Sequence, residues 1–289
     1  VESRTGINIS PEDLTRLDEL VSPLILQGQS PYMILQNHPE IPYSEKTLYN
    51  YIESGALSVK NIDLPKKVKY KIRSSGSSEP ADKAIYEGRT YKDLQAFLKE
   101  FPDTRITEMD TVLGCEGSRK TLLTFHFSGC SFMMAYLLDS KESRHVKNVF
   151  DSIEHAIGTF SFASAFSLIL TDRGGEFQIP DALECGEDNL IRTNIYYCDP
   201  MCSWQKPHCE KNHEYIRKIC PKGTSFDDYS QKDINLMMSH INSSPRQSLG
   251  GLSPMALAKL MLPQELLNFF ALTEIPADDI VLTPALLKK

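Results

Sequence analysis

The sequence predicts an α/β protein, in which a mixed sheet flanked by helices follows a small module built only of helices. Three observations predict this class. Apolar residues recur at helical spacing near the N-terminus, the periodicity changes to that of strands from residue 105, and helical and strand-like segments alternate after residue 140. With 289 residues, the chain can bury a sizeable core and is expected to hold two domains.

Three short helices are predicted at the N-terminal end. Ser10, Ser30 and Ser44 are each placed to cap a helix, and a proline follows the first two of them at the first helical position. Gly28 and Gly55 are placed to end the first and third helices. Three short helices with tight turns, over residues 1–60, are typical of a helix-turn-helix module, or of a plain structural bundle.

The third of these helices is the candidate for contact with DNA bases. Its spacing predicts that Leu48, Tyr49 and Ile52 face inward. The outward face is then formed by Lys46, Thr47, Asn50 and Tyr51. Lys46, Thr47 and Asn50 are therefore the residues expected to contact DNA.

A basic segment and a linker occupy residues 61–82. The net charge of −7 argues mildly against a nucleic-acid partner, but five cations stand within the eight residues 66–73. These cations are Lys66, Lys67, Lys69, Lys71 and Arg73. They are expected to contact DNA phosphates, although a solvated basic linker has the same composition. The small polar residues 74–80 predict a flexible linker and a domain boundary.

The predicted core covers residues 83–248, and residues 249–289 form a helical tail that packs on the core or on a second subunit. The expected elements are a helix at 91–101, strands at 105–113, 120–128 and 131–138, a helix at 141–158, strands at 165–171 and 193–198, and a helix that carries Glu210. If the first and fourth strands are parallel neighbours, their carboxyl ends bring Asp110 and Asp172 side by side.

Asp110, Asp172 and Glu210 are the candidate metal ligands. Asp172 ends an apolar run, where a carboxylate has no packing role because burial of an unpaired charge is costly. Three carboxylates at one point bind a divalent cation. Glu108 shares the face of Asp110 on an alternating strand and is expected beside the ligands.

The seven cysteines are an odd number without the spacing of a disulfide framework, which is typical of a reducing cytoplasm. The cysteines at 198, 202, 209 and 220 lie near His208 and His213, but they lack the paired spacing of common structural zinc sites. Zinc is therefore not expected. The longest apolar stretch, 160–170, is too short to cross a bilayer, so no membrane partner is expected.

Two segments carry a resemblance to a known family. These are Thr-Asp-Arg-Gly-Gly-Glu-Phe at 171–177 and the stretch 197–226, which holds Glu210 and ends near Pro-Lys-Gly-Thr. They resemble the bacterial insertion-sequence transposases of the IS-thirty family. The resemblance implies a ribonuclease-H-like core whose catalytic triad would be Asp110, Asp172 and Glu210. In two places the chain departs from the family, because Arg173 stands where Asn is common and the Asn-rich stretch after the third acid is Lys-Asn-His-Glu.

The resemblance also implies a function. Such an enzyme binds double-stranded DNA, both the terminal inverted repeats of its element and the target, acts as a homo-oligomer in the bacterial cytoplasm, and cuts and joins strands with two Mg²⁺ or Mn²⁺ ions. Glu176 is expected to orient the loop after Asp172. Five cations surround Glu210 and are expected to contact DNA phosphates, although a solvated helix face has the same composition; they are Lys206, Lys211, Arg217, Lys218 and Lys222. Two alternatives remain open: a catalytically silent DNA-binding regulator derived from a transposase, and a simple metal-dependent nuclease of the same fold.

Overall fold

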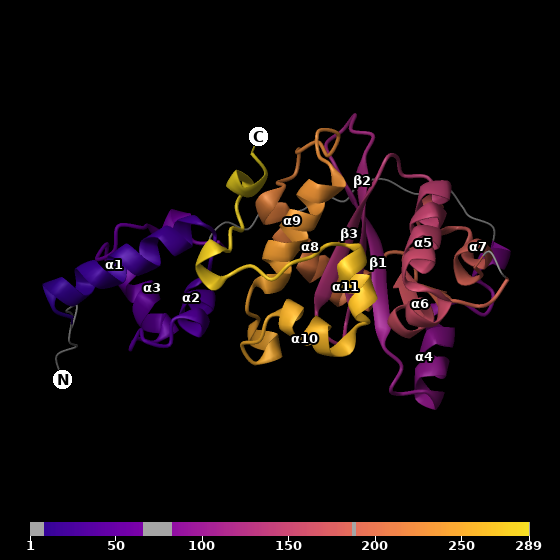
Figure 1. Cartoon of the computed structure of the whole chain (residues 1–289), viewed down its shortest axis with the longest axis horizontal. Helices are drawn as coiled ribbons and strands as arrows, with labels where there is room; N and C mark the ends of the chain where they lie inside the picture. The colour runs from indigo at the N-terminus through magenta and orange to yellow at the C-terminus, as the bar shows by residue number, and fades with distance from the viewer. Residues whose placement is uncertain (1–8, 66–82, 187–188, 289) are drawn as a thin grey trace.

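A central sheet carries helices on both faces, and a group of N-terminal helices lies at one end of the long axis of the molecule (Figure 1). The computed structural model describes residues 9–65, 83–186 and 189–288, without the side chains of Lys83, Ser203 and Glu210. Among these residues, none of the helices combines the length and the apolar character that a membrane span requires.

The sheet has five strands in the order β3-β2-β1-β4-β5. The strands are β1 (Ile106–Leu113), β2 (Thr121–Phe127), β3 (Phe132–Leu138), β4 (Leu168–Thr171) and β5 (Asn194–Tyr197). The first three strands pair antiparallel, whereas β4 is parallel to both β1 and β5. The predicted mixed sheet is therefore confirmed, and the first and fourth strands are parallel neighbours, which is the condition for Asp110 and Asp172 to lie side by side.

Helices cover the two faces of the sheet with separate apolar clusters. One face packs against α5 (Ser143–Ile157), α6 (Thr159–Ala165), α10 (Pro254–Met261) and α11 (Gln264–Phe269). The other face packs against α8 (Pro207–Ile219) and α9 (Gln231–Ser243). Two further helices, α4 (Tyr91–Glu100) and α7 (Pro180–Glu184), contact β5. All seven residues of β2 are buried because the sheet is covered on both sides.

The structure corrects one predicted strand and decides one open alternative. The apolar run at 165–171 was predicted as strand throughout, but α6 continues to Ala165 and β4 begins only at Leu168. Gly158, with a φ of 80°, lets the chain turn directly from α5 into α6. The C-terminal tail packs on the core, since α10 and α11 contribute Met255 and Leu266 to the cluster under the sheet.

The N-terminal module consists of α1 (Pro11–Leu26), α2 (Pro31–Asn37) and α3 (Glu45–Glu53). The three predicted caps are confirmed, because the side chains of Ser10, Ser30 and Ser44 each accept a backbone N–H of the first turn.

The predicted inward face of α3 is wrong at its two tyrosines. Tyr51 is only 7% exposed, whereas Tyr49 is 38% exposed. Tyr51 follows Leu48 by three residues and so shares its face, and it packs edge-to-face on Tyr43 with the ring centres 5.7 Å apart. Lys46 and Asn50 are exposed as expected.

The module is held to the core by the C-terminal tail, which reaches the end of the module nearest the core, beside α2 (Figure 1). The Gln29 side-chain amide donates to the carbonyl oxygens of Ala277 and Ile280, at 2.9 and 3.2 Å. His38 lies 2.9 Å from the Asp278 carboxylate. These contacts join residues about 240 positions apart in the chain, so the first and last segments form one unit.

Candidate metal-dependent active site

Asp110 and Asp172 lie at the same edge of the sheet. Glu108 of β1 pairs with Leu170 of β4, so Asp110 and Asp172 each stand two residues beyond the same pair. The Thr171 hydroxyl donates to the Met109 carbonyl oxygen at 3.1 Å and ties the end of β4 to the middle of β1. The two acids therefore lie side by side, but only Asp172 follows its strand, because β1 continues beyond Asp110 to Leu113.

Lys206 joins the two carboxylates. Its Nζ lies 3.3 Å from Asp110 Oδ2 and 3.8 Å from Asp172 Oδ2, and it donates to the Met109 carbonyl oxygen at 3.2 Å. The Lys206 side chain is only 7% exposed, while that of Asp172 is 49% exposed. Burial alone would lower the pKa of Lys206, but the two carboxylates outweigh it and raise that pKa.

The position of Lys206 was not predicted. It was grouped with the cations around the third acid that would grip DNA phosphates. Instead, its ammonium group occupies the point on which two acids converge, where a divalent cation would have the same partners. Nothing in the local sequence separates it from an ordinary surface lysine at the start of a helix.

Glu108 fixes the start of α8 against β1. Its carboxylate accepts the backbone N–H of Cys209 at 2.6 Å, in the first turn of the helix. Burial raises the pKa of Glu108 to about 7, although the N–H of Cys209 and the Lys206 ammonium work against the increase. The next residue is Glu210, whose backbone belongs to α8 and whose side chain lies outside the described structure. Glu108 therefore places the helix that carries the third predicted acid beside Asp110.

The loop after Asp172 depends on Gly174. Its N–H donates to Asp172 Oδ1 at 2.9 Å, and an added Cβ would lie 2.6 Å from Glu176 Oε2 and 3.0 Å from Asp172 Oδ1. Glu176 is buried, accepts the Thr111 hydroxyl at 2.7 Å and lies 3.4 Å from Lys141 Nζ. These contacts join the loop after Asp172 to β1.

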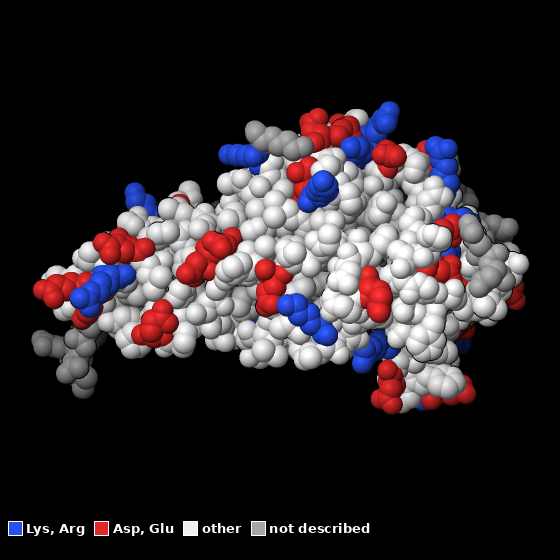
Figure 2. Space-filling view, viewed as in Figure 1, with Lys and Arg blue, Asp and Glu red and all other residues white. Residues whose placement is uncertain are grey.

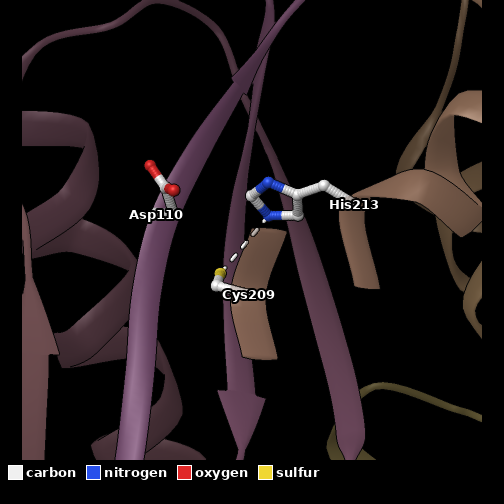
Figure 3. Close-up of side chains that lie close together, drawn as sticks. All are labelled: Asp110, Cys209 and His213. Carbon is white, nitrogen blue, oxygen red and sulfur yellow. Dashed lines mark hydrogen bonds between the residues drawn. The ribbon is translucent and has the colours of Figure 1, made fainter. Parts of the chain in front are cut away.

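A second set of donor atoms lies on the other side of Asp110. Cys209 and His213, one turn apart on α8, place their side chains toward the carboxylate of Asp110 (Figure 3). One atom of each residue lies within 4.8 Å of the others. Burial raises the pKa of the Cys209 thiol and lowers the pKa of His213, so neither group carries charge at neutral pH. Spacing along the chain did not reveal this group because Asp110 comes from a distant strand.

The candidate DNA contacts fall in three places. Lys211 is exposed on α8, whereas Arg217 is half-buried and donates to the Leu113 carbonyl oxygen at 2.8 Å. Lys46 and Asn50 lie on the exposed side of α3, and the Thr47 hydroxyl lies 2.8 Å from that of Ser44. The predicted basic arm, Lys66, Lys67, Lys69, Lys71 and Arg73, lies outside the described residues.

A cleft of about 1190 Å³ separates the N-terminal module from α8. Its walls include Tyr49 of α3 and, on the opposite side, the cations Lys211, Lys218 and Arg246. The face of the molecule in Figure 2 carries the opposite charge at its N-terminal end, where acidic side chains gather over the N-terminal helices. The cations that line the cleft make its α8 wall the more favourable surface for phosphates.

The chain is similar in sequence to transposases of bacterial insertion elements. The chain is 26% identical over 217 residues to "Probable transposase for insertion-like sequence element IS1161" of Streptococcus salivarius, which covers 75% of this chain and 58% of that protein. It is 26% identical over 165 residues to the transposase for insertion sequence element IS4351 of Bacteroides fragilis, which covers 56% of this chain and 47% of that one. The chain thus spans about half of the length of these relatives.

A shorter match, 34% identical over 55 residues, covers 19% of this chain and 14% of the transposase InsI for insertion sequence element IS30A of Escherichia coli. No protein-family model matches the chain. Among solved structures, the HTLV-2 integrase catalytic core domain in complex with magnesium covers 52% of this chain and 93% of its own, at a TM-score of 0.36 and 13% identity. By sequence, the chain is a relative of the insertion-sequence transposases. Its matches include those of IS30 elements, as its motifs predicted.

Proposed function

We propose that the chain is a DNA transposase of the Asp-Asp-Glu type, which cuts and joins DNA strands in a reaction that requires divalent cations. The observation that carries the proposal is the convergence of Asp110 and Asp172 on one buried ammonium group, beside the helix that holds Glu210. Two carboxylates that already share a cation are suited to exchange it for Mg²⁺, whose preferred ligands are oxygen atoms.

Each residue around this point has a distinct part in the proposal. Asp110, Asp172 and Glu210 would hold two Mg²⁺ or Mn²⁺ ions, which activate water and stabilise the attacked phosphate and the leaving oxygen. Lys206 balances the charge of Asp110 and Asp172 before the cations bind. Glu108 holds the first turn of α8 in place. Gly174 lets the loop after Asp172 approach closely.

The test is strand cleavage by the full chain on duplex DNA that carries the terminal repeats of the element. Asp110→Asn, Asp172→Asn and Glu210→Gln should each abolish Mg²⁺-dependent cleavage and leave DNA affinity nearly unchanged. Cleavage close to wild type by one of these variants would remove that residue from the site. Cleavage without strand joining would favour the simple nuclease, and specific binding without cleavage would favour the regulator.

We further propose that the N-terminal module recognises the repeats through α3 and that the basic arm supplies affinity, since base contacts specify whereas phosphate contacts position. Replacement of Lys46, Thr47 and Asn50 should erase the preference for repeat DNA over random DNA. Neutralisation of Lys66, Lys67, Lys69 and Lys71 should weaken binding to repeat DNA and to random DNA alike. It should also reduce the salt dependence of the binding constant by up to about 0.9 log units per lost phosphate contact. Full repeat preference in a core that starts at residue 83 would contradict this assignment.

A further inference from the structure

Three metal-binding side chains meet between β1 and α8. The Asp110 carboxylate, the Cys209 thiol and the His213 imidazole each offer an atom within 4.8 Å of the other two. Cys209 and His213 stand four residues apart and therefore on one face of α8, and Figure 3 shows both directed toward the strand that carries Asp110. This set differs from the three acids of the proposed cleavage site and shares only Asp110 with it.

The spacing of the sulfur and nitrogen donors suits a tetrahedral ion. Cys209 Sγ lies 3.4 Å from His213 Nε2. Zinc binds sulfur at about 2.3 Å and imidazole nitrogen at about 2.0–2.1 Å, so two such ligands at a tetrahedral angle are about 3.5 Å apart. The two side chains are thus already at the separation that a bound ion would impose. One carboxylate and an open fourth position would complete the set of three protein ligands that is typical of reactive zinc sites.

The backbone beside these donors is fixed. The Thr124 hydroxyl donates to the Asp110 carbonyl oxygen at 3.1 Å. It also lies 2.9 Å from His213 Nε2, so an ion bound at Nε2 would replace this contact. The Glu108 carboxylate accepts the N–H of Cys209 and fixes the first turn of α8. Cys209 is fully buried, while 19% of the Asp110 side chain is exposed, so an ion would reach the site from the Asp110 side. Groups of this kind orient metal ligands and raise affinity.

Charge also favours a soft divalent cation at this point. On binding, Cys209 would release its thiol proton, and the thiolate and the Asp110 carboxylate would together neutralise the two charges of the ion. Lys206 Nζ lies 3.3 Å from Asp110 Oδ2 and 3.8 Å from Asp172 Oδ2, so it would give up Asp110 and remain paired with Asp172. Cys209 and His213 offer sulfur and nitrogen, which Mg²⁺ does not prefer, whereas Asp172 offers only oxygen. Asp110 thus belongs to two sets of donors that attract different classes of metal.

We propose that Asp110, Cys209 and His213 form a binding site for a thiophilic divalent cation of the Zn²⁺ class, and that its occupation withdraws Asp110 from the Mg²⁺ ions of the cleavage site. The second part of this inference rests on the proposed function. The first part concerns binding alone and stands without it.

Binding is tested on the full chain with Co²⁺, which reports thiolate ligation by a charge-transfer band in the near ultraviolet. The wild-type protein should show this band, and Zn²⁺ should displace it. Cys209→Ser should lose the band, and His213→Asn should bind Co²⁺ more than about 100-fold more weakly. Cys220→Ser is the matched control because Cys220 is a buried thiol at the end of the same helix. It should retain the band.

Two results would overturn the site: absence of a thiolate band in the wild-type protein at saturating Co²⁺, or a band that survives in Cys209→Ser. Circular dichroism of each variant shows whether it is folded. If Cys209→Ser is not folded, the presence or absence of the thiolate band in the Co²⁺-loaded wild-type protein decides whether the site exists. Competition is measured by the rate of Mg²⁺-supported cleavage with and without Zn²⁺. Zn²⁺ should reduce this rate at least tenfold in the wild type and by a smaller factor in Cys209→Ser. An equal fall in both would refute competition, whereas absence of wild-type cleavage would refute the proposed function and leave the Co²⁺ result intact.

Discussion

Lys206 decides the charge balance of the candidate active site. Two neighbouring carboxylates repel each other, and the buried ammonium group between Asp110 and Asp172 removes that repulsion in the metal-free protein. Because Lys206 immediately precedes α8, any movement of its side chain on cation binding would occur at the start of the helix that carries Glu210. Charge neutralisation and the position of the third acid therefore depend on the same short segment.

Gly174 permits the second predicted ligand to adopt its position. In Gly174→Ala, the new Cβ would lie 2.6 Å from Glu176 Oε2 and 3.0 Å from Asp172 Oδ1, so both carboxylates must move. Since a displacement of about 1 Å can reduce a rate about 100-fold, we expect cleavage to fall between about 10-fold and 100-fold at unchanged DNA affinity. Gly175→Ala is the control, because its Cβ would meet no atom within 4 Å. Equal rates for the two variants would show that the loop has no such constraint.

At this scale, the position of Asp172 could be predicted because an acid that follows an apolar strand has little use in packing, whereas Asp110 lies within β1 and was singled out by its motif. Lys206, Cys209 and His213 could not be assigned their positions. Their partners come from β1, almost a hundred residues away, and helix α8 contacts that strand only in the folded chain.

The secondary-structure elements follow local rules to different degrees. The caps at Ser10, Ser30 and Ser44 and all five strands were predicted, because hydrogen-bonding side chains and alternation act within a few residues. The short helix α6 was missed, since a buried apolar run has the same composition in a helix as in a strand. The predicted inward face of α3 was wrong at Tyr49 and Tyr51, because packing on Tyr43 decides which of these two tyrosines is buried.

Strand β2 carries a histidine that should make the protein sensitive to acid. His126 is fully buried, stacks on His208 with the ring centres 5.7 Å apart, and neither ring nitrogen has a hydrogen-bond partner among the described residues. Burial lowers the pKa of His126 to about 3, and the nearby His208, Arg246 and His213 contribute to the decrease. In the unfolded chain the same group titrates at about 6.5.

Because the unfolded state binds this proton first, the contribution of His126 to stability is complete above pH 6.5 and is lost progressively as the pH falls toward 3. Between pH 7 and 4.5 the loss should be about 2–3 kcal/mol, at about 1.4 kcal/mol per pKa unit. In urea unfolding, His126→Leu should lose less stability than the wild type over this interval. The same loss in both proteins would show that His126 is not the acid-sensitive group.

At the scale of the whole molecule, the N-terminal module and the C-terminal tail depend on each other. The Leu282 N–H donates to the Gln27 carbonyl oxygen at 2.7 Å, and Met33 of α2 packs into the cluster that also contains Ile280 and Leu282. This arrangement could not be predicted from the sequence, because neither segment has a pattern that specifies the other as its partner. It places the candidate DNA-contacting helix at a defined distance from the acids.

Gly28 is the point of closest approach between the two segments. Both Gly28→Ala and Gly55→Ala place a side chain at a positive φ, of 89° and 74°, which costs about 1–2 kcal/mol in each case. Only at Gly28 would the new Cβ also lie 2.8 Å from a backbone oxygen, that of Leu282, whereas at Gly55 it meets nothing within 4 Å. Gly28→Ala should therefore reduce the free energy of unfolding by at least about 1 kcal/mol more than Gly55→Ala.

Limited proteolysis should in addition cleave the C-terminal tail faster in Gly28→Ala. Equal stability of the two variants, together with equal rates of cleavage of the tail, would contradict the docking of the tail on the module.

The central claim is that Asp172 belongs to a metal-dependent cleavage site because it follows a strand parallel to β1. Asp139 provides the control. It is an exposed acid that follows β3, a strand that runs in the same direction as β1 but is separated from it by β2. The decisive measurement is the single-turnover rate of Mg²⁺-dependent cleavage of repeat-bearing DNA at saturating protein. Asp172→Asn should abolish cleavage while Asp139→Asn retains the wild-type rate. Retention of cleavage by Asp172→Asn, or an equal loss in both variants, would contradict the account.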